Sequence, residues 1–91
     1  METSHTFAIC FSHKPGMILR IALVLERRGY TIESLFTTTE PHNPGYSEMV
    51  LTVKGDPSKL AQVTKQLAKL IDVLTVKELK KVYYAVASQV A

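Results

Sequence analysis

A turn containing Pro15 and Gly16 comes directly before an apolar segment with helical spacing, and it is the part of this chain best suited to chemistry. The first backbone N–H groups of a helix have no partner within the helix and carry a partial positive charge. Here those groups would belong to Gly16, Met17 and Ile18, and Gly16 has no side chain to block an approaching ligand. Such an end suits a small anion, for example a carboxylate. The alternative interpretation is a tight turn that binds nothing.

The other reactive side chains show no arrangement typical of catalysis. The histidines, His5, His13 and His42, lie in predicted loops or near segment ends, and the single cysteine, Cys10, lies inside an apolar run. No H-x-x-x-H or C-x-x-C spacing and no phosphate-binding glycine motif is present. The carboxylates fall at turns, helix ends or exposed strand positions, so no acid–base pair is indicated. We therefore expect no catalytic residue, no metal and no cofactor in this chain.

Size and composition favour one small folded domain. The chain has 91 residues, 46% of them hydrophobic, and a formal charge of +3. A domain of this size buries only about 60–65% of its unfolded surface, so a partner subunit would add to its core. The basic residues are spread out, and no apolar run approaches the roughly 18 residues of a membrane span. The polar start of the chain lacks the core of a signal peptide, so we expect a cytoplasmic protein without a membrane or nucleic-acid partner.

Six segments with regular spacing can be assigned. Residues 6–11, 30–39, 47–53 and 72–79 are predicted strands, and residues 17–28 and 57–71 are predicted helices. Gly29 is suited to end the first helix, and Asp56 followed by Pro57 is typical of a helix start. The predicted apolar stripes are Ile18, Ile21, Ala22 and Leu25 on the first helix and Leu60, Val63, Leu67, Leu70 and Ile71 on the second. On the strands, the residues predicted to face one way are Phe7, Ile9 and Phe11 on the first, Met49, Leu51 and Val53 on the third, and Leu74 with Val76 on the last.

The order β-α-β-β-α-β is that of the ferredoxin-like split βαβ pattern, an α+β fold. Two helices would cover one face of a four-stranded antiparallel sheet. The other face would be solvated, covered by the tail or packed against a second copy. We expect residues 1–6 to be a disordered N-terminus, residues 7–79 the domain, and residues 80–91 a C-terminal tail of strand or helix. RNA-binding modules of this fold carry stacking aromatics on the open sheet face, and residues 47–53 contain none.

Three motifs resemble those of the ACT domain, and more narrowly those of the regulatory (small) subunit of acetohydroxyacid synthase, also called acetolactate synthase. They are the corner "HKPG" at residues 13–16, the segment "RRGYTIESL" at residues 27–35, and "KQLAKLIDVLTVKEL" at residues 65–79. The resemblance covers residues 7–79 and is closest to the short, single-domain form. It implies that two copies pair side by side as a homodimer. It also implies that a branched-chain amino acid, usually valine, binds between them and signals feedback inhibition.

The same resemblance implies a partner and a set of site residues. The partner is the catalytic subunit, which the small subunit activates and which itself carries thiamine diphosphate, FAD and Mg²⁺. The implied ligand-binding residues are His13, Pro15, Gly16, Met17, Ile18, Thr31 and Ile32. Thr31 and Ile32 would come from the neighbouring subunit, and an apolar pocket of Met17, Ile18 and Ile32 would select a branched side chain.

The family pattern differs from this sequence at two positions. Regulatory subunits that respond to valine usually carry asparagine at the positions of His13 and Thr31. Asparagine offers both a donor and an acceptor, whereas His13 can donate to a carboxylate and Thr31 can accept from an ammonium group. Two alternatives therefore remain beside a valine-sensing subunit. One is a stand-alone ACT module that senses another amino acid and regulates another enzyme, and the other is a dimerisation module without a ligand.

Overall fold

Alternating apolar residues build four strands. The structure, a computed structural model, describes residues 2–79. Its strands are β1 (Thr3–Ser12), β2 (Thr31–Thr39), β3 (Tyr46–Gly55) and β4 (Val73–Leu79). They form one sheet in the order β2-β3-β1-β4, in which every neighbouring pair is antiparallel. The predicted antiparallel sheet is therefore confirmed.

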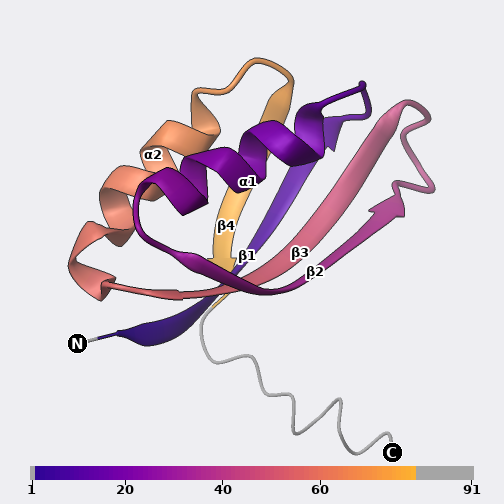
Figure 1. The fold of residues 1–91 in the computed structure, drawn as a ribbon. Helices are drawn as coiled ribbons and strands as arrows, with labels where there is room; N and C mark the ends of the chain where they lie inside the picture. Colours follow the sequence, from indigo (N-terminus) through magenta and orange to yellow (C-terminus); the bar gives the residue numbers. More distant parts are fainter. Residues whose placement is uncertain (1, 80–91) are drawn as a thin grey trace, which may run out of the picture.

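The two helices, α1 (Met17–Arg27) and α2 (Leu60–Ala68), lie side by side on one face of the sheet (Figure 1). A short 3₁₀ segment, Pro57–Lys59, precedes α2. With β1-α1-β2-β3-α2-β4 as the chain order, this is the predicted ferredoxin-like α+β fold. β1 and β3 occupy the centre of the sheet, so α1 and α2 cover the strands that carry most of the core.

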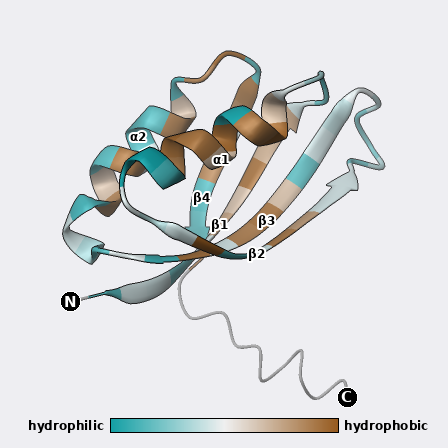
Figure 2. Ribbon diagram, in the orientation of Figure 1, coloured by the Kyte–Doolittle hydropathy of each residue, from teal (hydrophilic) through white to brown (hydrophobic). Residues whose placement is uncertain are grey.

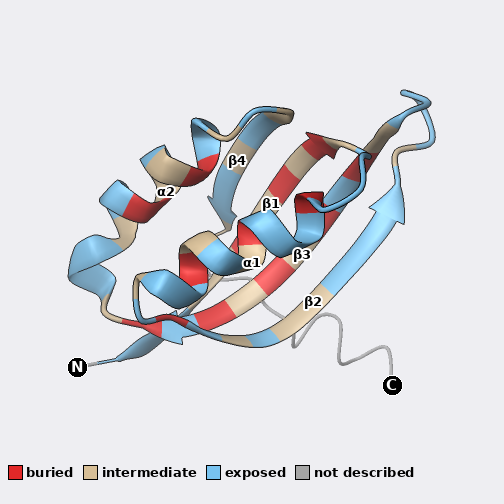
Figure 3. Ribbon diagram, turned by 45° about the horizontal axis from the view of Figure 1, so that its top comes forward, coloured by how far each residue is buried: buried red, intermediate tan, exposed pale blue. Residues whose placement is uncertain are grey.

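The core lies between the sheet and the helices, where the buried residues of β1 and β3 alternate along each strand (Figure 3). As predicted, Phe7, Ile9 and Phe11 share one face of β1. The fully buried apolar side chains are Phe7, Ile9, Phe11, Met17, Ile21, Leu25, Tyr30, Met49, Leu51, Val53, Val63 and Leu67. The opposite face of the sheet is not covered by any described element.

Residues 3–6 correct the prediction of a disordered N-terminus. They form the first part of β1, in register with residues 52–55 of β3, from Thr3 opposite Gly55 to Thr6 opposite Thr52. The segment is polar, so hydropathy gave no signal, but β3 offers it a full ladder of backbone partners. Residues 80–91, predicted as a tail, lie outside the described residues.

α1 is rotated relative to the predicted stripe. The side chain of Met17 is 1% exposed and packs in the core with Ile21 and Leu25, whereas Ile18 is 38% exposed. Most residues of α1 are hydrophobic (Figure 2), so two phases of the same 3.6-residue period fit its sequence. Packing against the sheet decides between them.

The second helix is shorter than predicted, and the strand after it is irregular. α2 ends at Ala68, and Ile71, predicted for the buried stripe, is exposed in the turn that follows. The pairing of β4 with β1 shifts by one residue at Leu74. This bulge leaves Leu74 exposed and turns Val73, with Val76, toward the core, so the prediction that Leu74 and Val76 face the same way is wrong.

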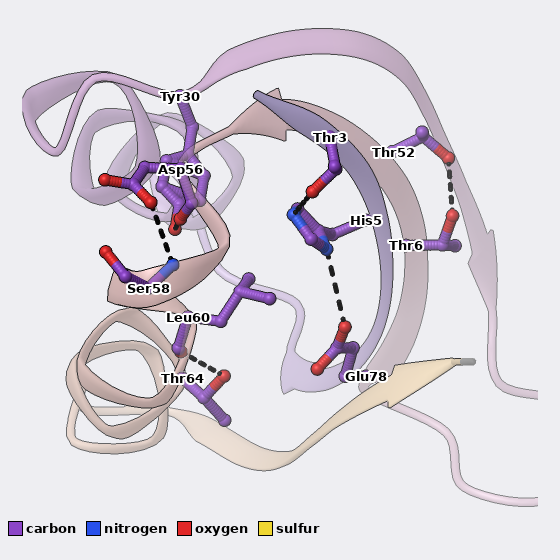
Figure 4. Close-up of polar contacts among 10 residues, drawn as sticks. All are labelled: Thr3, His5, Thr6, Tyr30, Thr52, Asp56, Ser58, Leu60, Thr64 and Glu78. Carbon is purple, nitrogen blue, oxygen red and sulfur yellow. Dashed lines mark hydrogen bonds and ion pairs between the residues drawn. The ribbon is translucent and has the colours of Figure 1, made fainter. Parts of the chain in front are cut away.

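The predicted helix start and stop are confirmed. Asp56 caps the 3₁₀ segment, because it accepts a hydrogen bond from the Ser58 amide at 2.9 Å (Figure 4). Pro57 occupies the first helical position. The Ser58 amide holds the pKa of Asp56 below its ordinary value of 3.8. Gly29, just after α1, has a φ of 86°, the left-handed conformation that glycine adopts without strain.

Candidate ligand site at the start of the first helix

The corner between β1 and α1 is a tight turn made by four residues, Lys14 to Met17. The Met17 amide donates to the Lys14 carbonyl at 3.2 Å, and Gly16 has φ 85° and ψ −4°. Proline at the second position and a positive-φ glycine at the third are the features of a type II turn. The Gly16 carbonyl then accepts the Arg20 amide at 3.0 Å and begins α1.

This turn changes which amides are free to bind an anion. Of the three predicted donors, Met17 uses its N–H within the turn, so it is not available to a ligand. Within residues 2–79, the amides of Gly16 and Ile18 donate to no backbone carbonyl. Two of the three predicted donors therefore remain available, next to the partial positive charge of the helix dipole.

A hollow of about 620 Å³ lies beside this turn. Its lining is mostly apolar and consists of Phe11, His13, Lys14, Pro15, Gly16, Ile18, Leu19 and Ala22. Four of the seven predicted site residues, His13, Pro15, Gly16 and Ile18, thus come together in one chain. An apolar wall beside free amide donors can hold a small molecule with a carboxylate at one end and an aliphatic group at the other.

The other three predicted residues do not line this hollow. The side chain of Met17 is buried in the core, so its predicted place in the ligand pocket is wrong for this chain. Thr31 and Ile32 begin β2 and pair with Lys54 and Val53 at the end of β3. His13 is held by Gly45, before the start of β3, so the two groups lie at opposite ends of the sheet. Their contribution from a neighbouring subunit stays a prediction.

His13 is fixed by two hydrogen bonds. Its backbone amide donates to the Gly45 carbonyl at 2.8 Å, and its ring Nδ1 lies 2.9 Å from the hydroxyl of Ser47. Ser47 is 3% exposed, so this hydroxyl is a rigid support for the ring. The Phe11 ring lies 6.5 Å from the imidazole, centroid to centroid. These contacts fix the orientation of the imidazole ring on its Nδ1 side, and the side chain remains exposed to solvent.

Sequence reasoning missed several residues around this site. Leu19 and Ala22 line the hollow together with Ile18, whereas the predicted stripe placed Ile18 and Ala22 on the core face of α1 and did not include Leu19. Lys14 forms an ion pair with Asp72, whose carboxylate lies 3.1 Å from the ammonium nitrogen. In the sequence, Ser47 looks like any other strand residue. Only the register between β1 and β3 brings its side chain close to His13.

The described residues hold no arrangement of a catalytic or metal centre. No group of three His, Cys, Asp or Glu side chains is close enough within residues 2–79 to hold a metal ion. Burial, with smaller effects from Glu40 and Glu48, raises the pKa of the Cys10 thiol above its ordinary value of 9.0. A thiol with a raised pKa is a poor nucleophile at neutral pH. None of the helices in this part of the chain has the length and hydropathy to cross a membrane.

Solved structures with the same architecture include ACT domains. The ACT domain of GTP pyrophosphokinase from Chlorobium tepidum superimposes with a TM-score of 0.71 over 87% of this chain and 100% of its own, at 21% identity, which shows a shared fold. The acetolactate synthase small subunit from Thermotoga maritima superimposes with a TM-score of 0.75 at 31% identity, over 88% of this chain and 49% of that one. The fold and the corner therefore define an ACT domain.

Sequence comparison narrows the class. Residues 7–75 match the family described as "AHAS small subunit-like ACT domain". The probable acetolactate synthase small subunit of Methanothermobacter thermautotrophicus is 42% identical over 77 residues, covering 85% of this chain and 45% of the relative. The acetolactate synthase small subunit of Mycobacterium avium is 40% identical over 78 residues, covering 85% and 46%. The chain belongs to the small-subunit-like ACT domain family of acetohydroxyacid synthase, and it spans about half the length of these relatives.

Proposed function

We propose that this chain is a regulatory subunit of acetolactate synthase that binds and activates the catalytic subunit and senses a branched-chain amino acid, valine, for feedback control. The observation that carries the proposal is the hollow beside the type II turn, where two free amides adjoin an aliphatic wall on a chain of this family. Relatives named as small subunits of this enzyme support the assignment of the partner.

The residues suggest how an amino acid would be held. Its carboxylate would accept hydrogen bonds from the amides of Gly16 and Ile18, at the positive end of α1. His13 would donate from its exposed edge. The aliphatic side chain would lie against Ile18, Leu19 and Ala22, which are the apolar part of the lining.

The described lining of the hollow contains no carboxylate, so the ammonium group of an amino acid needs a further hydrogen-bond acceptor. We propose that a second copy supplies it. In a homodimer with side-by-side sheets, the start of β2 of the neighbour would bring Thr31, whose hydroxyl can accept from an ammonium, and the aliphatic Ile32. Binding between subunits would let the amino acid alter how the two domains sit against each other.

The chemistry of the enzyme would belong to the partner. We propose that thiamine diphosphate, FAD and Mg²⁺ are held by the catalytic subunit and that this chain binds none of them. The role of this chain is then to change the activity of that subunit according to the occupancy of the site.

Calorimetry of the full chain against the twenty amino acids tests the sensing role. We expect valine, leucine or isoleucine to bind more tightly than the other seventeen. Tight binding of a different amino acid would favour a stand-alone module that regulates another enzyme. The presence of His13 and Thr31 in place of asparagine is consistent with that alternative. Binding of none, with an unchanged melting temperature at saturating ligand, would favour a dimerisation module.

A further inference from the structure

A second hollow, of about 590 Å³, is lined by residues of both helices and of the segments just after them. Its lining is Arg20, Leu23, Val24, Arg27, Arg28, Gln66, Lys69 and Leu70. We call it the interhelical groove. It lies on the α2 side of α1, whereas Ile18, Leu19 and Ala22 belong to the candidate ligand site, so α1 borders both hollows.

The interhelical groove has a strong positive charge that its surroundings do not neutralise. Four of its eight lining residues are cationic and none is acidic. The ion pairs within residues 2–79 are His5 with Glu78 and Lys14 with Asp72, and neither involves a groove residue. Arg28 is held in place, because its Nε donates to the Gln66 side chain at 2.8 Å.

Helix stability accounts for some of these cations but not for all. Arg27 in the last turn of α1 and Lys69 at the C-cap of α2 lie where the helix dipole favours positive charge. Arg20 lies in the first turn of α1, where the dipole disfavours a cation and favours an acidic residue. The stability of the helix therefore does not explain the presence of Arg20 at the groove.

The floor of the groove indicates the kind of partner. Leu23 is 39% exposed, and Val24 and Leu70 are partly buried, so an apolar strip lies between the charged rims. An apolar centre with a charged rim is typical of protein–protein interfaces. Nucleic-acid sites of this size stack bases on aromatic side chains, and none lines this groove.

From the positive charge of the rims and the apolar floor, we infer that the interhelical groove binds an acidic surface of the catalytic partner. Carboxylates of the partner would pair with the arginines, and an apolar side chain of the partner would pack on the floor. This inference rests on the proposed function, since it names the surface of this chain that meets the partner. Docking here would leave the candidate ligand site open on the other side of α1.

A pair of charge-reversal variants tests the inference. Arg20→Glu/Arg27→Glu changes the groove, and Lys65→Glu/Lys77→Glu makes the same change in net charge at exposed residues outside it. The affinity of each full-length variant for the cognate catalytic subunit is measured at low and high salt. Circular dichroism checks that both variants fold. If charge reversal disturbs folding, Arg20→Gln/Arg27→Gln replaces it.

We expect the groove variant to bind at least about tenfold more weakly at low salt, mainly through slower association, and the control variant to stay within about twofold of the wild type. The difference should shrink at high salt, where exposed charges are screened. Valine affinity should be equal in all three proteins.

Equal binding of the wild type and the groove variant would overturn this inference and leave the proposed function standing. Failure of the wild type itself to bind a catalytic subunit would overturn both. A single-stranded oligonucleotide and inorganic triphosphate serve as further probes. One further outcome would also overturn the inference. If the groove variant lost affinity for either probe but kept its affinity for the catalytic subunit, the groove would be assigned to a phosphate-bearing ligand instead.

Discussion

Gly16 combines two roles that can be separated experimentally. Its left-handed backbone makes the type II turn, and its missing side chain keeps the amide end of α1 open. Gly29 has nearly the same φ, 86° against 85°, and a methyl group added at either glycine meets no atom within 4 Å. Gly29 is therefore a matched control for backbone strain.

For Gly16→Ala and Gly29→Ala we predict similar losses of stability, about 1–2 kcal/mol each, because alanine is strained in the left-handed region. Urea unfolding measures this loss. Only Gly16→Ala should also weaken valine binding, since its methyl group would occupy the approach to the Gly16 and Ile18 amides. Equal valine affinity in the two variants would show that the corner is a turn without a ligand role.

His13 is the side chain whose proposed contact differs most from the family pattern. We predict that His13→Ala weakens valine binding by about 2- to 13-fold, the range that corresponds to about 0.5–1.5 kcal/mol for one net hydrogen bond made by an exposed side chain. His42→Ala, in the exposed loop between β2 and β3, is the control and should not change the affinity. Calorimetry measures both. An unchanged affinity of His13→Ala would remove the histidine from the site.

At the scale of the elements, the start of the second helical segment carries a prediction about pH. Asp56 has a pKa below 3.8 in the folded state, first because it accepts the Ser58 amide. The stabilisation is therefore fully present above the unfolded pKa and is lost as the pH falls through the folded pKa. Asp56→Ala should lower the melting temperature at pH 7, and this difference should shrink below pH 3.8.

Thermal unfolding followed by circular dichroism from pH 2 to pH 7 checks this behaviour. Glu26→Ala, an exposed position in α1 that caps no helix, is the control and should shift the curve without changing its shape. A difference between wild type and Asp56→Ala that stays constant over the whole range would contradict the capping role.

The elements also show what the sequence could predict. Strand alternation predicted the core faces of β1 and β3, and residue type predicted Asp56, Pro57 and Gly29 as helix boundaries, because these signals are local. The phase of α1 was missed because the helix is apolar on more than one side. The bulge at Leu74 and the pairing of residues 3–6 depend on the neighbouring strand, so no local pattern contains them.

The candidate site was predictable to the same extent. The turn and its glycine are visible in a few adjacent residues, and four predicted site residues do meet. The use of the Met17 amide within the turn, the burial of its side chain and the support of His13 by Ser47 are consequences of tertiary packing.

For the molecule as a whole, the proposed sensing of valine requires a site shared by two copies. A symmetric dimer would contain two such sites, each with His13 from one subunit and Thr31 from the other. His13→Ala and Thr31→Ala should each weaken valine binding when alone. If subunits exchange freely, mixing the two variants should restore about one site in four, because half of the dimers are mixed and each of these has one intact site.

Calorimetry on the refolded mixture, compared with each variant alone, measures this recovery. Light scattering on the same samples checks that they are dimers. Dimers in which no binding returns on mixing would place the whole site within one chain.

The most direct measurement of the central claim is the activity of the cognate catalytic subunit, loaded with its cofactors, with and without this chain and with increasing valine. We predict that adding the chain raises acetolactate formation and that valine then lowers it. Gly16→Ala should weaken the inhibition by valine, and Arg20→Glu/Arg27→Glu should weaken the activation. An activity that is the same with and without the chain, at every valine concentration, would contradict the central claim.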